Sequence, residues 1–189
     1  MLPVYAIATN TTSSLGINVK AHWNAVQQGK SGIVCHDDVS LSAAPFWGAK
    51  IDASQWQYIQ AQTRTSATIS PFEQLAIFAG KQALNACNQD ITPEDTLVVL
   101  STTKGNIEWL GIYDDERLSL HKSADIIAEA LGMNKHKPVV VSHACVSGVL
   151  ALVYAMRRLQ QGTHKHAIVI GCDRFSRFVL SGFQSFQAV

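Results

Sequence analysis

The stretch that decides the fold runs from residue 138 to 162: Pro-Val-Val-Val-Ser-His-Ala-Cys-Val-Ser-Gly-Val-Leu-Ala-Leu-Val-Tyr-Ala-Met-Arg-Arg-Leu-Gln-Gln-Gly. Its β-branched apolar run, Val139 to Val141, predicts a buried strand. Small or polar residues around Cys145 then predict a tight turn, and the apolar pattern that follows predicts a long helix. Gly162 is a typical residue to end such a helix.

The predicted helix carries two kinds of apolar position. Small residues at 148, 151 and 155 leave room for a neighbouring backbone to approach closely. The larger apolar side chains are Val149, Leu152, Val153, Met156 and Leu159. This composition predicts a central, buried helix.

Cys145 lies at or beside the first turn of this helix, where unpaired backbone N–H groups and the helix dipole favour an anion. We therefore expect its thiol to ionise more readily than that of a free cysteine, as in a reactive nucleophile on a strand-to-helix turn. The other interpretation is an inert core thiol, which is common in apolar segments. The spacing alone does not decide between them. His143 is either a base in a Cys/His pair or an ordinary hydrogen-bonded histidine.

The rest of the chain alternates predicted strands and helices. Ser70-Pro71-Phe72-Glu73 is a capping box that begins a helix, and Gly132 is typical of a helix end. Residues 30–70 predict a loop with short pieces of structure. The predicted strands are 4–8, 96–101, 138–144 and 167–171, and the predicted helices begin near Val19, Ser70, Ser123 and after Cys145. This order predicts an α/β fold, with a mostly parallel sheet and helices on both faces.

Composition limits the class of protein. The chain has 189 residues, of which 47% are hydrophobic and 15% charged, with a net charge of +1. These values predict one folded domain and argue against a disordered chain or a nucleic-acid binder. No run of 18 apolar residues is present, so we expect a soluble, cytoplasmic protein without a membrane partner. The four cysteines lack CxxC spacing and are expected to stay reduced.

Several motifs resemble the β-ketoacyl-acyl-carrier-protein synthases, the condensing enzymes of the thiolase fold. The strongest is Ser142-His143-Ala144-Cys145-Val146-Ser147-Gly148, followed by the strand that ends in Gly171-Cys172-Asp173. The others are Leu15-Gly16, Trp23 with Gly29-Lys30-Ser31-Gly32-Ile33, residues 98–106, and Ser181-Gly182-Phe183-Gln184-Ser185-Phe186. Together they span nearly the whole chain in the family's order.

The resemblance implies a thiolase-like fold in which residues 1–189 form an incomplete N-terminal synthase domain. It implies the strand order third, second, first, fourth, with the strand before Cys145 at a sheet edge. A second subunit would cover that edge, because an open apolar edge invites aggregation. We expect a homodimer or a complementing ketosynthase chain.

By the same resemblance, Cys145 accepts an acyl group from an acyl-carrier-protein thioester. A malonyl thioester then loses carbon dioxide and attacks the bound acyl group, in fatty acid or polyketide synthesis. The backbone N–H of Cys145 would stabilise the oxyanion. The family's two catalytic histidines come from a second half, and no histidine follows His166 here. We therefore expect complete condensation to need another source of histidines. No cofactor or metal is implied.

Four further residues are predicted to bind substrate. Gly105 and Asn106 resemble part of an acyl-channel loop, although the residues alone predict only a strand-to-helix turn. Phe183 and Phe186 resemble acyl-pocket residues, and core packing explains them equally well.

Three other features weigh less. His164 and His166 are more typical of an exposed turn than of a metal site, which needs further ligands. Cys172 and Asp173 end a strand and either face a site or, for the thiol, fill the core. Asp114, Asp115 and Glu116 are typical of a solvated surface.

Three functions stay open. The first is an acyltransferase of the ketosynthase type, and the second is a non-catalytic thiolase-fold chain that dimerises through its edge strand. The third is another thiolase-fold enzyme that uses coenzyme A thioesters, or a cysteine hydrolase.

Overall fold

The computed structural model describes residues 3–63 and 69–187, and the chain divides into two compact units. The first unit combines Met1–Thr9 with Thr63–Asp173, and the second combines Asn10–Gln62 with Arg174–Val189. The assignment of residues 1–189 to one synthase domain stays a prediction.

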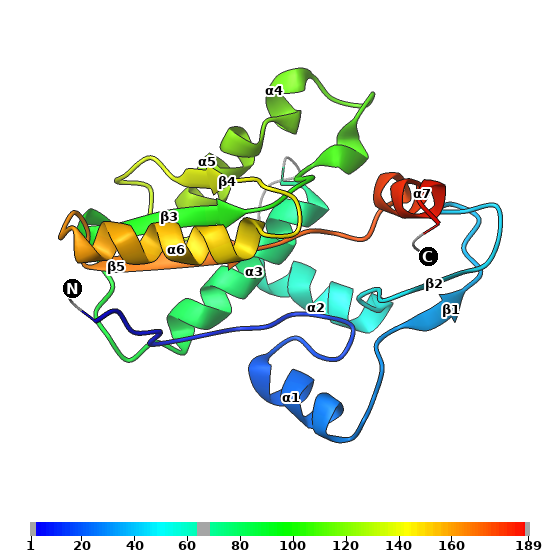
Figure 1. Ribbon diagram of the computed structural model, residues 1–189, viewed down its shortest axis with the longest axis horizontal. Coiled ribbons are helices and arrows are strands. Elements are labelled where there is room, and N and C mark those ends of the chain that lie inside the picture. The colour runs from blue at the N-terminus through cyan, green and yellow to red at the C-terminus, as the bar shows by residue number, and fades with distance from the viewer. Residues whose placement is uncertain (1–2, 64–68, 188–189) are drawn as a thin grey trace. The chain divides into compact units, whose positions relative to one another are not determined.

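The first unit contains a parallel three-stranded sheet (Figure 1). Strand β3 (Thr96–Ser101) lies between β4 (Val139–Val141) and β5 (His166–Gly171) and is parallel to both. In this register Leu100 lies opposite Val140 and Ile170. Every residue of β3 is buried, which explains its continuous apolar run.

Helices cover both faces of this sheet, as predicted. Val98 and Leu100 of β3 pack against α3 (Pro71–Asn85) and α5 (Leu120–Ala130). The intervening Leu97 and Val99 pack against α6 (Ser147–Gln160) on the opposite face. This alternation follows from the two-residue period of a strand. The short helix α4 (Asp115–Leu118) and the 3₁₀ turns η1 (Pro93–Asp95) and η2 (Ile107–Trp109) complete the unit.

The predicted strand order is wrong. β3 and β5 are hydrogen-bonded neighbours over their full lengths, so no first strand separates them. Residues 4–8 are not a strand, and the side chains of Tyr5 and Ile7 are exposed. This segment is apolar enough for a strand, but strands need a hydrogen-bonding neighbour, and it has no ladder partner among the described residues. The predicted edge position of β4 is confirmed within the sheet that the structure describes.

The sequence predicted that the helix after Cys145 is buried, but only one face of α6 is. Its small residues Ala151 and Ala155 face the sheet, where they are at most 4% exposed. Val149 and Leu152 are each 60% exposed. Small side chains let the helix lie close to β3 and β5, and the bulky apolar residues then fall on the outer face. Gly162 has φ +70° and ends the helix as predicted.

The second unit is built from short elements. It contains α1 (Val19–Gln27), the antiparallel pair β1 (Val34–His36) and β2 (Phe46–Gly48), α2 (Ala53–Gln62) and α7 (Arg177–Ser185). The sequence predicted α1 but not the ten-residue α2, whose weak amphipathic pattern resembles a loop. Phe46 stacks on Phe175 with ring centroids 5.6 Å apart.

The longest helices in the described part of the chain are α3 and α6, with 15 and 14 residues. Across those residues, no helix has both the length and the apolar character needed to span a bilayer.

Candidate functional site

The three parallel strands end side by side. Ser101 lies opposite Val141 and Gly171, and the chain stays paired one residue further. The Thr102 N–H donates to the Val141 carbonyl at 3.3 Å, and the Cys172 N–H donates to the Ser101 carbonyl at 3.0 Å. The loops that follow all three strands therefore begin side by side at the C-terminal ends of the strands, which is where parallel α/β sheets hold their ligands.

Cys145 lies on the turn that joins β4 to α6. The residue before it, Ala144, has φ +44°, a left-handed conformation that a residue with a Cβ adopts only under strain. The thiol is exposed, which excludes the interpretation of Cys145 as a sealed core residue. Val146, the N-cap of α6, makes no side-chain hydrogen bond to the first turn. Cys145 thus immediately precedes the N-cap of a 14-residue helix, whose N-terminal end carries the positive end of the dipole.

Ser147 braces this turn. Its hydroxyl accepts a hydrogen bond from the His143 N–H at 2.7 Å and donates one to the Ala144 carbonyl at 2.7 Å. The residue is 5% exposed. The sequence did not single out Ser147, because a serine at the start of a helix is typical of many helices.

Asp173 joins the loops after β5 and β3. Its carboxylate accepts hydrogen bonds from the Thr102 hydroxyl at 2.7 Å, from the Thr103 N–H at 3.1 Å and from the Lys104 N–H at 3.2 Å. The sequence left open whether Asp173 faces a site. In the structure it fixes the loop that leads to Gly105 and Asn106.

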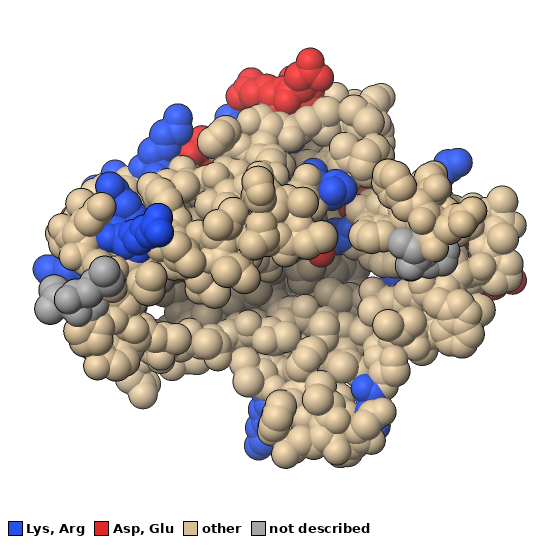
Figure 2. Space-filling model, viewed as in Figure 1, with Lys and Arg blue, Asp and Glu red and all other residues tan. Residues whose placement is uncertain are grey.

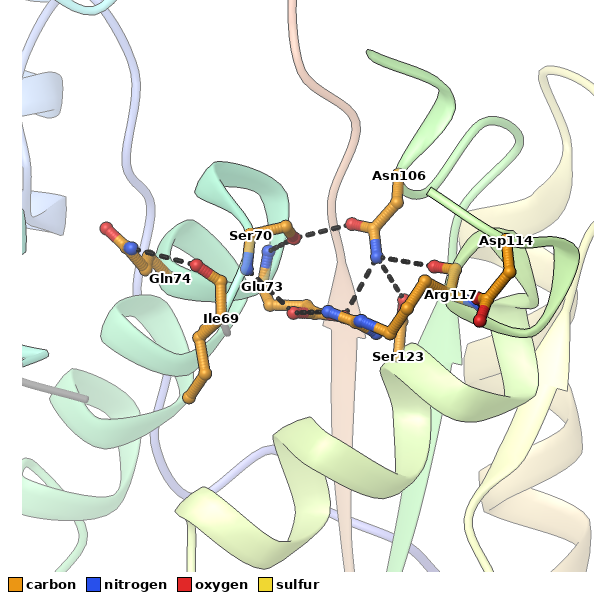
Figure 3. Close-up of polar contacts among 8 residues, drawn as sticks. All are labelled: Ile69, Ser70, Glu73, Gln74, Asn106, Asp114, Arg117 and Ser123. Atoms are coloured by element: carbon orange, nitrogen blue, oxygen red, sulfur yellow. Dashed lines mark hydrogen bonds and ion pairs between the residues drawn. The ribbon is translucent and has the colours of Figure 1, made fainter. Parts of the chain in front are cut away.

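A buried polar network lies behind that loop (Figure 3). The Asn106 side-chain amide donates to Glu73 at 2.9 Å, to the Ser123 hydroxyl at 3.0 Å and to the Arg117 carbonyl at 3.1 Å. Its oxygen accepts from the Ser70 hydroxyl. The network connects the start of α3, the loop after β3, and helices α4 and α5.

Glu73 is the charged centre of this network and has no exposed surface. Arg117 donates to both of its carboxylate oxygens, at 3.0 and 2.8 Å, in a two-point ion pair. Burial by itself raises the pKa of Glu73, but hydrogen bonds from Arg117, the Ser70 N–H and Asn106 outweigh it. The pKa therefore lies below its usual value. The guanidinium also lies 4.9 Å from the centre of the Trp109 ring.

The four predicted substrate-binding residues belong to different units of the chain. Gly105 and Asn106 are buried in the first unit, where the Asn106 amide is engaged as described. Gly105 has φ +52°, and a side-chain carbon there would collide with Leu120, so the position requires glycine. Phe183 and Phe186 belong to the second unit and are 51% and 85% exposed. Substrate contact by any of the four stays a prediction.

The histidines of the first unit that the structure describes belong to no cluster of side chains able to hold a metal. No group of three His, Cys, Asp or Glu side chains able to hold a metal occurs in residues 3–63 and 69–187. His143 is exposed. His164 packs edge-on against His136 with ring centroids 4.7 Å apart. Burial, the charge of His136 and that of Arg158 lower the pKa of His164.

Charge is sparse on the surface over α6 (Figure 2). The only charged residues of this helix are Arg157 and Arg158, in its last turn. Asp114, Asp115 and Glu116 form an exposed acidic cluster at α4, and Asp114 caps that helix. Before its last turn α6 is therefore uncharged, and its exposed side chains include those of Val149 and Leu152.

Comparison with known proteins shows which proteins the chain resembles. No protein-family model matches the sequence. A curated relative, the β-ketoacyl-acyl-carrier-protein synthase III of Prochlorococcus marinus (strain MIT 9312), is 29% identical over 135 residues. The match covers 69% of this chain and 36% of the relative.

Solved structures show the same fold. The ishigamide ketosynthase/chain length factor superposes with a TM-score of 0.76 at 24% identity, over 97% of this chain and 56% of that one. The chain has the thiolase-like fold of the ketosynthases. The ketosynthase of Xenorhabdus doucetiae, solved in complex with its chain length factor, gives a TM-score of 0.66 at 18% identity. That match covers 96% of the ketosynthase-like chain and 50% of its neighbour.

The ketosynthase-like chain thus spans little more than a third of the curated relative and about half of each solved neighbour. The likeness to the solved structures establishes the fold alone.

Proposed function

We propose that the chain carries the acyl-accepting cysteine of a condensing enzyme. In this proposal Cys145 attacks the thioester carbonyl of an acyl group borne by an acyl carrier protein. The new bond joins the Cys145 sulfur to the acyl carbon, and the carrier thiolate leaves and takes up a proton. A malonyl thioester then loses carbon dioxide, its carbanion attacks the acyl carbon, and the Cys145 thiolate is released.

One observation carries the proposal: an exposed thiol on a left-handed turn at the N-terminal end of α6, within a ketosynthase fold. Each chemical step develops negative charge on a thioester oxygen beside this helix end, where backbone N–H groups favour an anion. The backbone N–H of Cys145 is the proposed first donor. The curated relative is named for the same carrier-protein chemistry.

The histidines that assist malonyl decarboxylation are assigned to a second segment or a complementing chain. No histidine occurs after His166 in the sequence given. The Xenorhabdus neighbour assembles with a chain length factor, which supports a partner of the ketosynthase type. Acyl loading uses Cys145 itself, whereas condensation also uses the family's histidines.

The proposed assembly is a dimer through the open edge of β4. β4 is the last strand of the described sheet on that side, and its three valines are half-buried. A second β4, from another copy or a related chain, would complete the edge. All four cysteines are free thiols, which supports the cytoplasm as the place of action.

The second candidate is a non-catalytic chain that only dimerises. The exposed apolar residues of α6 and the open edge of β4 favour it, because both suit an interface whatever the chemistry. A third candidate, an enzyme that loads from coenzyme A thioesters, shares the nucleophile and differs in the donor.

Intact-mass spectrometry distinguishes the three. The folded chain is incubated with acyl-acyl-carrier-protein or with acyl-coenzyme A, and the added mass is located by peptide mapping. We expect one acyl group on Cys145 from the carrier-protein donor. Loading from coenzyme A alone would favour the third candidate, and a folded chain that takes no acyl group would favour the second.

Cys35 provides the matched control, because it is the other exposed thiol among the described residues. Cys145→Ala is expected to abolish the adduct and change stability little, since an exposed thiol makes few contacts. Cys35→Ala is expected to keep the adduct. An adduct that survives Cys145→Ala would contradict the proposed role of Cys145.

A further inference from the structure

The turn that carries Cys145 is held in a costly conformation. A residue with a Cβ at φ +44° loses roughly 1 kcal/mol relative to the common backbone regions. Such a residue stays left-handed only when its surroundings impose it. The backbone bonds across the turn are long, with the Val146 N–H 3.2 Å from the His143 carbonyl and the Ser147 N–H 3.4 Å from that of Ala144.

The short bonds across the turn come from one side chain. The Ser147 hydroxyl accepts from the His143 N–H and donates to the Ala144 carbonyl, each at 2.7 Å. It therefore ties together the two residues immediately before Cys145. Because Ser147 is the first residue of α6 and is 5% exposed, the helix fixes the position of its hydroxyl.

We propose that Ser147 is a positioning residue: its hydroxyl holds Ala144 in the left-handed conformation and so fixes the direction in which Cys145 presents its sulfur. The benefit of this direction for acyl transfer rests on the function proposed above. The bracing itself does not, because it concerns the geometry of the thiol and of the His143 amide.

Two substitutions separate the hydroxyl from the rest of the side chain. Ser147→Ala removes both hydrogen bonds with little change in size, and Ser147→Thr keeps a hydroxyl at the same atom. Thr96→Val is the matched control, because the Thr96 hydroxyl also donates a part-buried hydrogen bond to a carbonyl, that of Thr92 at 2.6 Å. Thr96 lies at the other end of β3 from the turn.

The first measurement needs no acyl donor. Reaction of the full chain with 5,5′-dithiobis(2-nitrobenzoate) requires a bulky disulfide to approach the Cys145 sulfur in line. Each variant carries Cys35→Ala, and the Cys145 adduct is followed by peptide mapping. We expect Ser147→Ala to slow the reaction about tenfold, the effect of roughly one net hydrogen bond. Ser147→Thr should restore it, and Thr96→Val should leave it unchanged.

Hydrogen exchange reports the brace directly. The His143 amide should exchange about tenfold faster in Ser147→Ala than in the unsubstituted chain, and Ser147→Thr should protect it again. Acyl transfer to Cys145 should follow the same order of variants. If the unsubstituted chain reacts with the disulfide and takes no acyl group, the proposed function fails while the disulfide rates still test the brace.

Two results would overturn the positioning role. One is a Ser147→Ala variant that reacts at the unsubstituted rate with an unchanged His143 amide. The other is a Thr96→Val variant that slows as much as Ser147→Ala, since the effect would then come from general loss of stability.

Discussion

Glu73 is fully buried and charged, and every hydrogen bond that keeps it so comes from a different part of the first unit. Ser70 is the N-cap of α3, Asn106 follows β3, and Arg117 lies on α4. A buried carboxylate is stable only when such partners replace its lost hydration. The network therefore locks the loop that carries Gly105 and Asn106.

Glu73→Gln is expected to lower the free energy of unfolding by about 2–3 kcal/mol at neutral pH, because it breaks the ion pair and leaves Arg117 without its two-point partner. The Arg117 side chain is 17% exposed, which keeps the loss below that of a fully sealed pair. Urea unfolding measures the difference. Glu116→Gln, which breaks the exposed pair with Lys122, should cost less than about 0.5 kcal/mol.

The effect of Glu73→Gln on the free energy of unfolding should depend on pH. The pKa of Glu73 is lower in the folded chain than in the unfolded one, so the unfolded state binds the proton first on acidification. The stability gained from Glu73 is fully present above its ordinary pKa of 4.5 and is lost as the pH falls through the lower pKa of the folded chain. The gap between the unsubstituted chain and Glu73→Gln should therefore narrow below that pH. A constant gap would contradict the charged assignment.

Individual residues differ in how far the sequence reveals them. The Ser70–Glu73 capping box was predicted from four consecutive residues, and both of its bonds are present. Arg117 lies 44 positions from Glu73, and no local pattern connects them. No local pattern marks Ser147 either, because its proposed role depends on the backbone conformation of Ala144, which composition does not encode.

Among the elements, α6 shows which structural features the apolar pattern can predict. The pattern predicted the helix and its end at Gly162, both of which are confirmed. It could not identify the buried face, because apolar residues occur on both sides. The apolar pattern also predicted a strand at residues 4–8, which is wrong because a run of apolar residues does not reveal whether a hydrogen-bonding neighbour exists. The strand order implied by the resemblance is wrong for the same reason, since it places that strand between β3 and β5.

The orientation of α6 can be tested with two substitutions. Ala151→Leu adds bulk against the buried sheet and should cost about 2–3 kcal/mol of unfolding free energy. Leu152→Ala, one position along, removes a side chain that is 60% exposed and should cost less than about 1 kcal/mol. Denaturant unfolding of the two variants gives the comparison. If Leu152→Ala lowered the unfolding free energy more than Ala151→Leu, the face of α6 that carries Leu152 would be the one packed against the sheet.

At the scale of the whole molecule, the proposed dimer depends on the backbone of β4. The Val141 carbonyl accepts the Thr102 N–H, so Val141 and Val139 bond toward β3. Alternate residues of a parallel strand bond to opposite sides, and the N–H and C=O of Val140 therefore point to the open edge.

Val140→Pro removes the outward donor and should convert the dimer to a monomer while helical content is kept, because the pairing with β3 stays intact. Val139→Pro removes an inward donor and should instead destabilise the sheet. Light scattering measures the mass of the assembly, and circular dichroism measures the helical content, for both variants. A Val140→Pro chain that still dimerises would move the interface away from β4.

The most direct test of the central claim is the acyl adduct on Cys145. The account predicts that the folded chain, given an acyl-carrier-protein thioester, gains the mass of one acyl group, that hydroxylamine removes it, and that peptide mapping places it on residue 145. If the chain is folded, Cys145 reacts with an ordinary disulfide reagent, and no thioester ever loads it, the acyl-transfer account is contradicted.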